Sequence, residues 1–347
     1  MANFPAWYIM SWLPRLLWPS VSGDRIGLSP AAGCMPGVSG DRIVRLVFLG
    51  DLSAVMNRRP PVVDAALRDR IAAADLVVAN CESPVVERPH HPLLTRIRGL
   101  HAMKPSLLRQ ALSAAGIRPD RLVLSLANNH ALDQGVSGLE ETVAALGELG
   151  ATIAGLVAAP PPLVSVGGIS ISFDAFTIWR NAPARPFAKV IAMDPRPAAR
   201  PPADLVCVLP HWDREFRHVP ADWTRTLAKR LVGDGAGLVV GGHPHVPQPV
   251  EVFGGALVAY ALGDFLGTAW FRIRWPLRIA AMIEVDVSAG PESRGRIASW
   301  TIVPFYRLPD GDRERLVPIG GLPDTIGDRV AKRVEAIFAT QPPSSSP

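Results

Sequence analysis

Cysteine is scarce in this sequence, with 3 residues among 347: Cys34, Cys81 and Cys207. Their wide spacing excludes a zinc site built from thiolates, and an odd, sparse set argues against a framework of disulfides. Cys81 and Cys207 fall within or beside apolar runs, where a cysteine is usually a small buried side chain. Cysteine chemistry is therefore not expected to carry the function.

Long apolar runs and dense basic runs are also missing. The formal net charge of +5 is spread along the chain without an aromatic and basic stripe, so we expect no nucleic-acid partner. Residues 1–19 are rich in Trp and Leu, but prolines and Arg15 interrupt them, and they are too short for a membrane span. No basic segment precedes them, as one would in a signal peptide. We expect a cytoplasmic or membrane-peripheral protein.

The expected organisation is a single domain over 44–340 between two poorly ordered ends, 1–43 and 341–347. For the N-terminal end, interfacial anchoring by Trp7, Trp12 and Trp18 is the alternative. Within the domain, apolar spacing predicts five helices, over 61–74, 104–115, 135–149, 220–232 and 325–339. Strands are predicted over 151–155 and 169–178, and strands of a second sheet over 256–260, 279–287 and 297–305. Residues 182–202 are expected to be a proline-rich loop.

Five short apolar runs each end in a polar residue suited to bind a ligand. The runs are 44–49, 75–79, 122–127, 205–210 and 237–240, and they are followed by Asp51, Glu82, Asn128-Asn129-His130, His211 and Gly241-Gly242-His243-Pro244-His245. Continuous apolar runs are typical of buried strands in α/β sheets, which gather ligands at their carboxyl ends. Asp51 and Asn128 are also ordinary turn formers. The repetition over five strands nevertheless predicts a clustered metal site.

The Gly-Gly-His-Pro-His stretch at 241–245 is the most informative part of the chain. In an extended backbone, His243 and His245 would point to the same side, with Pro244 fixing the chain between them. Imidazole, carboxylate and amide ligands without thiolate favour manganese, iron or zinc over copper. A surface loop that merely contains histidines is the alternative for this stretch alone.

At this point the sequence resembles the CapA family, the capsule and poly-γ-glutamate biosynthesis proteins within the calcineurin-like metallophosphoesterase superfamily. The motifs are those at 80–84, 127–135, 211–215, 242–248 and 260–265, and the resemblance runs from about Arg45 to about Thr268. It implies a four-layer α/β sandwich, with two mixed β-sheets flanked by helices and two divalent metal ions (Mn, Fe or Zn) at the strand ends.

The resemblance also implies roles for single residues. Asp51 and His245 resemble ligands of the first metal, and Glu82 resembles the carboxylate that bridges both metals. The second metal would take Asn129, with Asn128 as the alternative, together with His211 and His243. His130 resembles the histidine that faces the substrate, and Asp133 is expected to orient it.

Three positions depart from the family pattern: Ser53 where many metallophosphoesterases have histidine, Asp213 where glycine is usual, and Asp264 where asparagine is usual. The additional carboxylate at Asp213 or Asp264 could bind metal or could mark altered chemistry. We expect a metal-dependent hydrolase, acting on a phosphoester or on poly-γ-glutamate in capsule or cell-envelope polymer biosynthesis. The alternative is a non-hydrolytic accessory protein of capsule assembly that keeps the metal site and contacts other assembly proteins. The expected substrate is an anionic small molecule or polymer, bound by Arg58 and Arg59.

Overall fold

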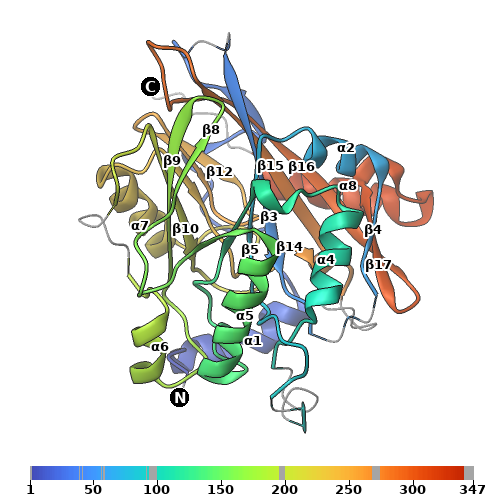
Figure 1. The fold of residues 1–347 in the computed structure, drawn as a ribbon. Helices are drawn as coiled ribbons and strands as arrows, with labels where there is room; N and C mark the ends of the chain where they lie inside the picture. Colours follow the sequence, from blue (N-terminus) through green and yellow to red (C-terminus); the bar gives the residue numbers. More distant parts are fainter. Residues whose placement is uncertain are drawn as a thin grey trace.

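The computed structural model describes residues 2–38, 40, 42–55, 57, 59–90, 92–93, 100–194, 200–267 and 274–339. Two mixed β-sheets pack face to face, with helices on their outer sides (Figure 1). This arrangement confirms the expected fold class. No helix within these ranges combines the length and the apolar character needed to cross a bilayer.

The larger sheet has ten strands within the described ranges, in the order β4-β17-β16-β15-β3-β5-β6-β7, with β14 beside β3 and β2 beside β16. Strands β3, β5, β6 and β7 run parallel, whereas β15, β16 and β17 are antiparallel. The bounds are β2 Ala32–Cys34, β3 Ile43–Leu52, β4 Val62–Val63, β5 Leu76–Asn80, β6 Leu122–Ser125, β7 Thr152–Ala154, β14 Asp264–Leu266, β15 Ile279–Ser288, β16 Ile297–Asp310 and β17 Arg313–Pro318.

The smaller sheet has seven strands within the same ranges, in the order β1-β12-β13-β11-β10-β9-β8. Its bounds are β1 Leu28–Ser29, β8 Leu163–Val166, β9 Ile169–Thr177, β10 Leu205–His211, β11 Leu238–Val240, β12 Val250–Phe253 and β13 Ala256–Ala259. Strands β9, β10, β11 and β13 are parallel neighbours, so their carboxyl ends lie along one edge.

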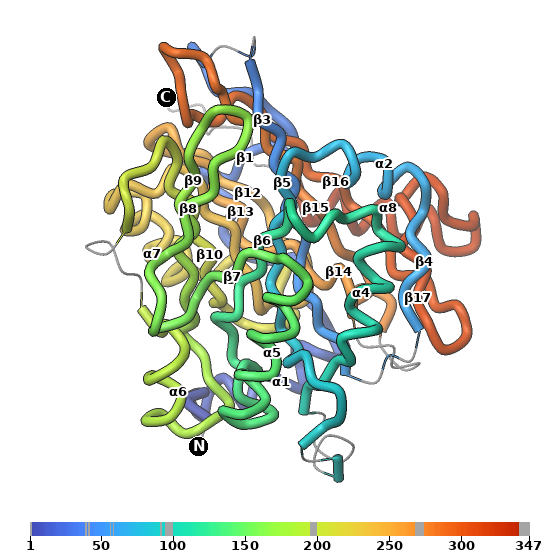
Figure 2. The backbone as a smooth tube through the Cα atoms, viewed as in Figure 1, coloured from blue at the N-terminus to red at the C-terminus, as the bar shows by residue number. Residues whose placement is uncertain are grey.

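The helices are α1 Ala6–Leu17, α2 Ala65–Ala72, α4 Pro105–Ala114, α5 Gly135–Leu149, α6 Ala184–Val190, α7 Asp222–Gly233 and α8 Asp324–Phe338. Helix α7 packs on the smaller sheet through Leu231, and α8 packs on the larger sheet through Val330. The main core lies between the sheets, where Phe48 of β3 and Phe173 of β9 belong to one apolar cluster. Figure 2 shows β3, in blue, beside β5 in the interior of the molecule.

The N-terminal segment differs from the poorly ordered extension expected for 1–43. Residues 6–17 form helix α1, and residues 28–34 contribute a strand to each sheet. One face of α1 buries Tyr8 and Arg15 against the rest of the protein, and Pro14 is accommodated within the helix. Most of the other large apolar side chains of the helix are exposed, among them Trp7, Ile9 and Met10. The expected tail at 341–347 lies outside the described residues.

Two further expectations need correction. The stretch 182–202 contains helix α6, because Phe187 anchors it in the core. Residues 256–260 were grouped with 279–287 and 297–305 in a second sheet, but β13 pairs with β11 while β15 and β16 belong to the sheet of β3. The five strands that deliver polar residues are thus divided between the two sheets, and the site forms where the two sheets meet.

Candidate metal centre

The candidate site lies at the carboxyl ends of strands from both sheets. Asp51 is the last residue but one of β3, and Glu82 and Asn129 follow β5 and β6 in the larger sheet. His211 ends β10, and His243 and His245 follow β11 in the smaller sheet. An isolated parallel bridge between His211 and Gly242 joins the last two segments. All six predicted ligands therefore come together at one place.

The backbone at 241–245 is not extended, which corrects the argument made from the sequence. His243 and His245 have φ angles of 95° and 54°, in the left-handed region that side chains other than glycine rarely adopt. The turn is fixed from outside, since His243 N donates to Asp51 Oδ2 at 3.1 Å and Phe216 N donates to Pro244 O at 2.8 Å. The histidines are brought together by this turn and not by alternation along a strand.

Position 242 must be glycine because the side chains of Asp51 and His211 lie close to its backbone. A Cβ atom at Gly242 would lie 2.6 Å from Asp51 Oδ1 and 3.3 Å from His211 Nδ1. A larger residue would displace the carboxylate at the centre of the site. This position explains why a glycine directly precedes His243.

Four side chains form the first candidate ligand group: Asp51, Glu82, His245 and Asp264. Their donor atoms all lie within 4.8 Å of one another. His245 Nδ1 lies 2.7 Å from Asp264 Oδ1 and 3.7 Å from both Asp51 Oδ2 and Glu82 Oε2. Asp264 comes close because β14 pairs with the end of β3 at Asp51. The sequence left open whether Asp264 binds metal or marks altered chemistry, and the predicted ligand set did not include it.

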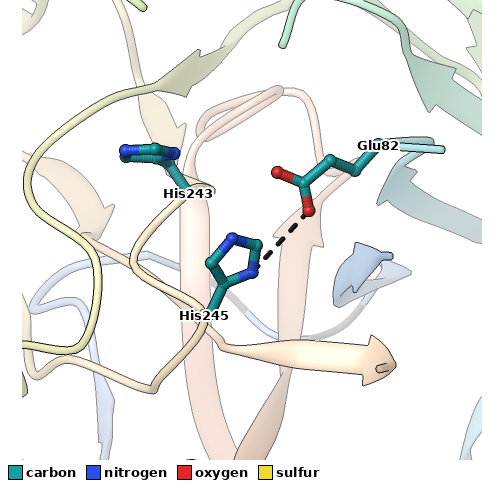
Figure 3. A group of neighbouring side chains, drawn as sticks. All are labelled: Glu82, His243 and His245. Atoms are coloured by element: carbon teal, nitrogen blue, oxygen red, sulfur yellow. Dashed lines mark ion pairs between the residues drawn. The ribbon is translucent and has the colours of Figure 1, made fainter. Parts of the chain in front are cut away.

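A second group shares Glu82 and His245 with the first and adds His243. Glu82, His243 and His245 again place their donor atoms within 4.8 Å, and Figure 3 shows both imidazoles beside the Glu82 carboxylate. His211 Nε2 lies 2.7 Å from Asn129 Oδ1 and 3.5 Å from Glu82 Oε1. Glu82 therefore stands between the two groups.

The neighbouring amides have separate tasks. Asn129 contacts His211, whereas Asn128 donates to Asn80 Oδ1 and to the Cys81 carbonyl. Asn80 in turn donates to Asp51 Oδ1 at 2.9 Å. Asn80 was missed as a site residue, although its place directly before Cys81-Glu82 at the end of a strand was a signal for it.

Burial of like charges dominates the electrostatics of the centre. Burial, followed by the nearby Glu82, raises the pKa of Asp51 to about 8, and burial raises the pKa of Glu82 as well. Burial alone would lower the pKa of His245, but Glu82 and Asp264 raise it well above its ordinary value. Carboxylates concentrated in this way favour a cation between them.

Buried polar atoms without hydrogen-bond partners indicate whether these residues suit a metal ion. Glu82 is fully buried, and neither of its carboxylate oxygens has a hydrogen-bond partner of good geometry. His243 is also fully buried, and its Nδ1 has no hydrogen-bond partner. Burial lowers the pKa of His211 and His243 well below the ordinary value, so both imidazoles are neutral. Neutral imidazoles and unpartnered carboxylate oxygens are what divalent metal ions bind, so the residues fit.

His130 and Asp133 form a pair next to this centre. His130 Nδ1 lies 2.7 Å from Asp133 Oδ2, which also accepts from the backbone N of His101 at 2.8 Å. The rings of His101 and His130 stack at 3.6 Å, and Asn181 Nδ2 lies 3.2 Å from His130 Nδ1. Burial would lower the pKa of His130, but the Asp133 carboxylate raises it. His101 and Asn181 had no local sequence signal, because both reach the pair from distant loops.

The remaining predicted residues lie elsewhere. Arg59 forms an exposed ion pair with Asp312, with Nε and Oδ2 3.4 Å apart, and Arg58 lies outside the described residues. Asp213 is buried and belongs to neither ligand group; its Oδ2 accepts from Ala221 N at 3.2 Å and from Gln248 Nε2 at 3.0 Å. Asp213 thus fixes the loop after His211.

Taken together, the fold and the site define an α/β protein with a cluster of candidate divalent-metal ligands where two mixed sheets meet. The family model described as bacterial capsule synthesis protein, PGA_cap, matches residues 45–269. The chain belongs to this family.

Two curated relatives show the extent of the similarity. PGA biosynthesis protein CapA of Bacillus subtilis is 30% identical over 226 residues, which cover 58% of this chain and 56% of that protein. A protein of Mycobacterium tuberculosis named as a polyglutamine synthesis accessory protein is 32% identical over 168 residues, 41% of this chain and 44% of its own length. The chain thus spans about half the length of the curated relatives it matches.

Among solved structures, the calcineurin-like phosphoesterase YfkN from Bacillus subtilis is similar at 11% identity with a TM-score of 0.43, covering 85% of this chain and 98% of that chain. The structural likeness is low.

Proposed function

We propose that this protein is a metal-dependent hydrolase that cleaves a phosphoester during formation of a capsule or cell-envelope polymer. One observation carries the proposal: Asp51, Glu82, His245 and Asp264 bring their donor atoms within 4.8 Å of one another in a buried setting, and Glu82 and His245 do the same with His243. So many ionisable groups are costly to bury together unless a cation neutralises them.

The two ligand groups suit two divalent ions, of manganese, iron or zinc. Asp51, His245 and Asp264 would hold the first, with Glu82 between the ions. The second would be held by the neutral side chains Asn129, His211 and His243. When bound, two such cations neutralise the oxygens of a phosphoryl group and make water a better nucleophile near neutral pH.

His130 is the residue we assign to proton transfer. Its pKa is raised by Asp133, so it can hold a proton near neutral pH and give it to a leaving alkoxide. The hydrogen bond to Asp133 occupies Nδ1 and leaves Nε2 to face the substrate. His130 is partly accessible, with 15% of its side chain exposed, whereas only 2% of Asp133 is exposed. This difference suits a proton donor supported by a buried carboxylate.

The substrate we propose is anionic, a small molecule or a polymer such as poly-γ-glutamate. The names of the curated relatives, which refer to biosynthesis of such polymers, support this class. The net charge of +5 favours an anionic partner as well. Arg58 and Arg59 remain our proposed cations for it, with Arg59 held by Asp312 before substrate binds.

A second candidate is a non-hydrolytic accessory protein that keeps the metal centre and contacts other capsule-assembly proteins. Two observations favour it. Ser53 stands close to Glu82 where a further imidazole ligand would complete the first group, and the relative from Mycobacterium tuberculosis carries an accessory name.

Metal analysis of the purified protein, followed by hydrolysis of an aryl phosphate with and without Mn²⁺, separates the two candidates. Bound metal with Mn²⁺-stimulated turnover supports the hydrolase. Bound metal without turnover on phosphomonoesters or phosphodiesters supports the accessory protein. A protein that binds no divalent metal contradicts both.

A further inference from the structure

Helix α1 carries Tyr8 into the wall of the candidate metal centre. The helix, dark blue next to the N label in Figure 1, precedes the residues 45–269 that match the family model. Tyr8 is only 2% exposed, and its hydroxyl oxygen lies 2.7 Å from His243 Nε2. A residue from the segment expected to be disordered thus contacts a candidate ligand directly.

The position of Tyr8 is fixed independently of its hydroxyl group. The tyrosine ring packs against Phe4 and Trp179, with centroids 4.8 and 5.0 Å away. Asn3 secures the same segment, donating from Nδ2 to Ile178 O and accepting from Arg180 N, both at 2.8 Å. Removal of the hydroxyl alone should therefore leave α1 in place.

His243 uses its two ring nitrogens differently. Nε2 is taken by Tyr8, whereas Nδ1 is buried and has no hydrogen-bond partner. An imidazole nitrogen binds a metal only when it carries no proton, and the hydrogen bond of the other nitrogen decides which one that is. The Tyr8 oxygen also accepts a hydrogen bond from Glu215 N at 3.3 Å, and a second lone pair remains to accept an Nε2 hydrogen.

We propose that Tyr8 is a positioning residue for the metal centre: its oxygen accepts the Nε2 hydrogen of His243 and so leaves Nδ1 bare toward the ligand group. This inference rests on the proposed metal binding. It makes α1 part of the site, because the contact that fixes the imidazole comes from that helix. Metal binding and docking of α1 then strengthen each other.

In the competing arrangement, Tyr8 blocks the metal site. If His243 bound metal through Nε2, the Tyr8 hydroxyl would occupy the metal's place and α1 would have to leave. The two arrangements predict opposite effects of metal on the helix, and this difference provides the test.

The first measurement is the affinity for Mn²⁺, by calorimetry on the full chain, for wild type, Tyr8→Phe and Tyr260→Phe. Tyr260 is the matched control, because it is also buried and its hydroxyl donates to Glu251 instead of a candidate ligand. We expect Tyr8→Phe to weaken binding about 10-fold to 100-fold, as is usual for partners of metal-bound histidines, and Tyr260→Phe to leave it unchanged. Equal affinity in wild type and Tyr8→Phe overturns the inference alone. A wild type that binds no Mn²⁺ overturns the proposed function, and the inference with it.

The second measurement is hydrogen exchange of the α1 amides, with and without saturating Mn²⁺. We expect metal to slow exchange in wild type, and Tyr8→Phe to keep the metal-free protection while losing most of this slowing. A purely structural role of the hydroxyl would not give that pattern. Faster exchange of α1 on adding Mn²⁺ would show that Tyr8 blocks the metal site, and it would overturn the inference.

Discussion

Asp264 Oδ1 lies 2.7 Å from His245 Nδ1, and the other oxygen of the same carboxylate lies 3.2 Å from a guanidinium nitrogen of Arg307. Arg307 is 1% exposed and also pairs with Glu314, which in turn pairs with Arg278. Asp264 thus connects the candidate metal centre to a buried ion network behind it. This network gives the Asp264 carboxylate a buried positive partner.

Replacing Asp264 tests that connection. Asp264→Ala should lower the free energy of unfolding by about 3 kcal/mol, because it leaves a buried guanidinium with one carboxylate partner fewer. Asp264→Asn should cost less, since an amide oxygen can still accept one hydrogen bond. Urea unfolding measures both, with Asp120→Ala, in an exposed ion pair, as the control that should change little. A loss in Asp264→Ala no larger than in this control would contradict the network's importance.

His243→Ala should remove most of the bound metal, because it deletes a fully buried imidazole from the second ligand group. Elemental analysis of the purified variant gives the metal content per chain. His90→Ala is a suitable control, since His90 pairs with Glu141 on the surface. Unchanged metal content in His243→Ala would rule out its place among the ligands.

His130→Ala should keep its metal but lose turnover on an aryl phosphate, by about 10²-fold to 10⁴-fold, the usual contribution of a general acid or base. Asp133→Asn should lose less, because the imidazole remains and only its partner is weakened. Steady-state rates at saturating Mn²⁺, with metal content measured on the same samples, provide the check. Loss of metal in His130→Ala would assign it to the ligands instead.

The metal-free protein should lose stability as the pH rises from about 7 to 8. The pKa of Asp51 is raised to about 8, and the pKa values of Glu82 and His245 are raised as well. In the unfolded chain these groups have already lost their protons at about pH 7. The folded state therefore binds more protons in this range, and the free energy of unfolding falls with pH. His211 and His243, whose pKa values are lowered, contribute only below about pH 6.5.

Urea unfolding of EDTA-treated protein at the two pH values measures this slope. Asp51→Asn should reduce it, because one group that retains a proton is removed. Saturating Mn²⁺ should abolish the loss, since the cation takes the place of the protons. A slope that is identical in wild type and Asp51→Asn would show that Asp51 does not cause it.

Much of this site could be predicted from the sequence, because strand ends are a local property. The apolar runs 44–49 and 205–210 placed Asp51 and His211 just after two strands, and the structure has them among the last residues of β3 and β10. The remaining features depend on contacts between distant segments. The turn at His243 is held by Asp51, and His101 reaches His130 from another loop. Helix α1 could not be recognised because its buried face has meaning only against the packed protein.

The backbone at His243 and His245 has one more consequence. Left-handed conformations of residues other than glycine cost on the order of 1–3 kcal/mol each, and both histidines adopt them, on either side of Pro244. Glycine at either place would relax the turn and make the folded chain more robust while removing an imidazole. Selection for thermal stability alone would therefore favour variants that fold more stably but lack the metal-binding imidazoles.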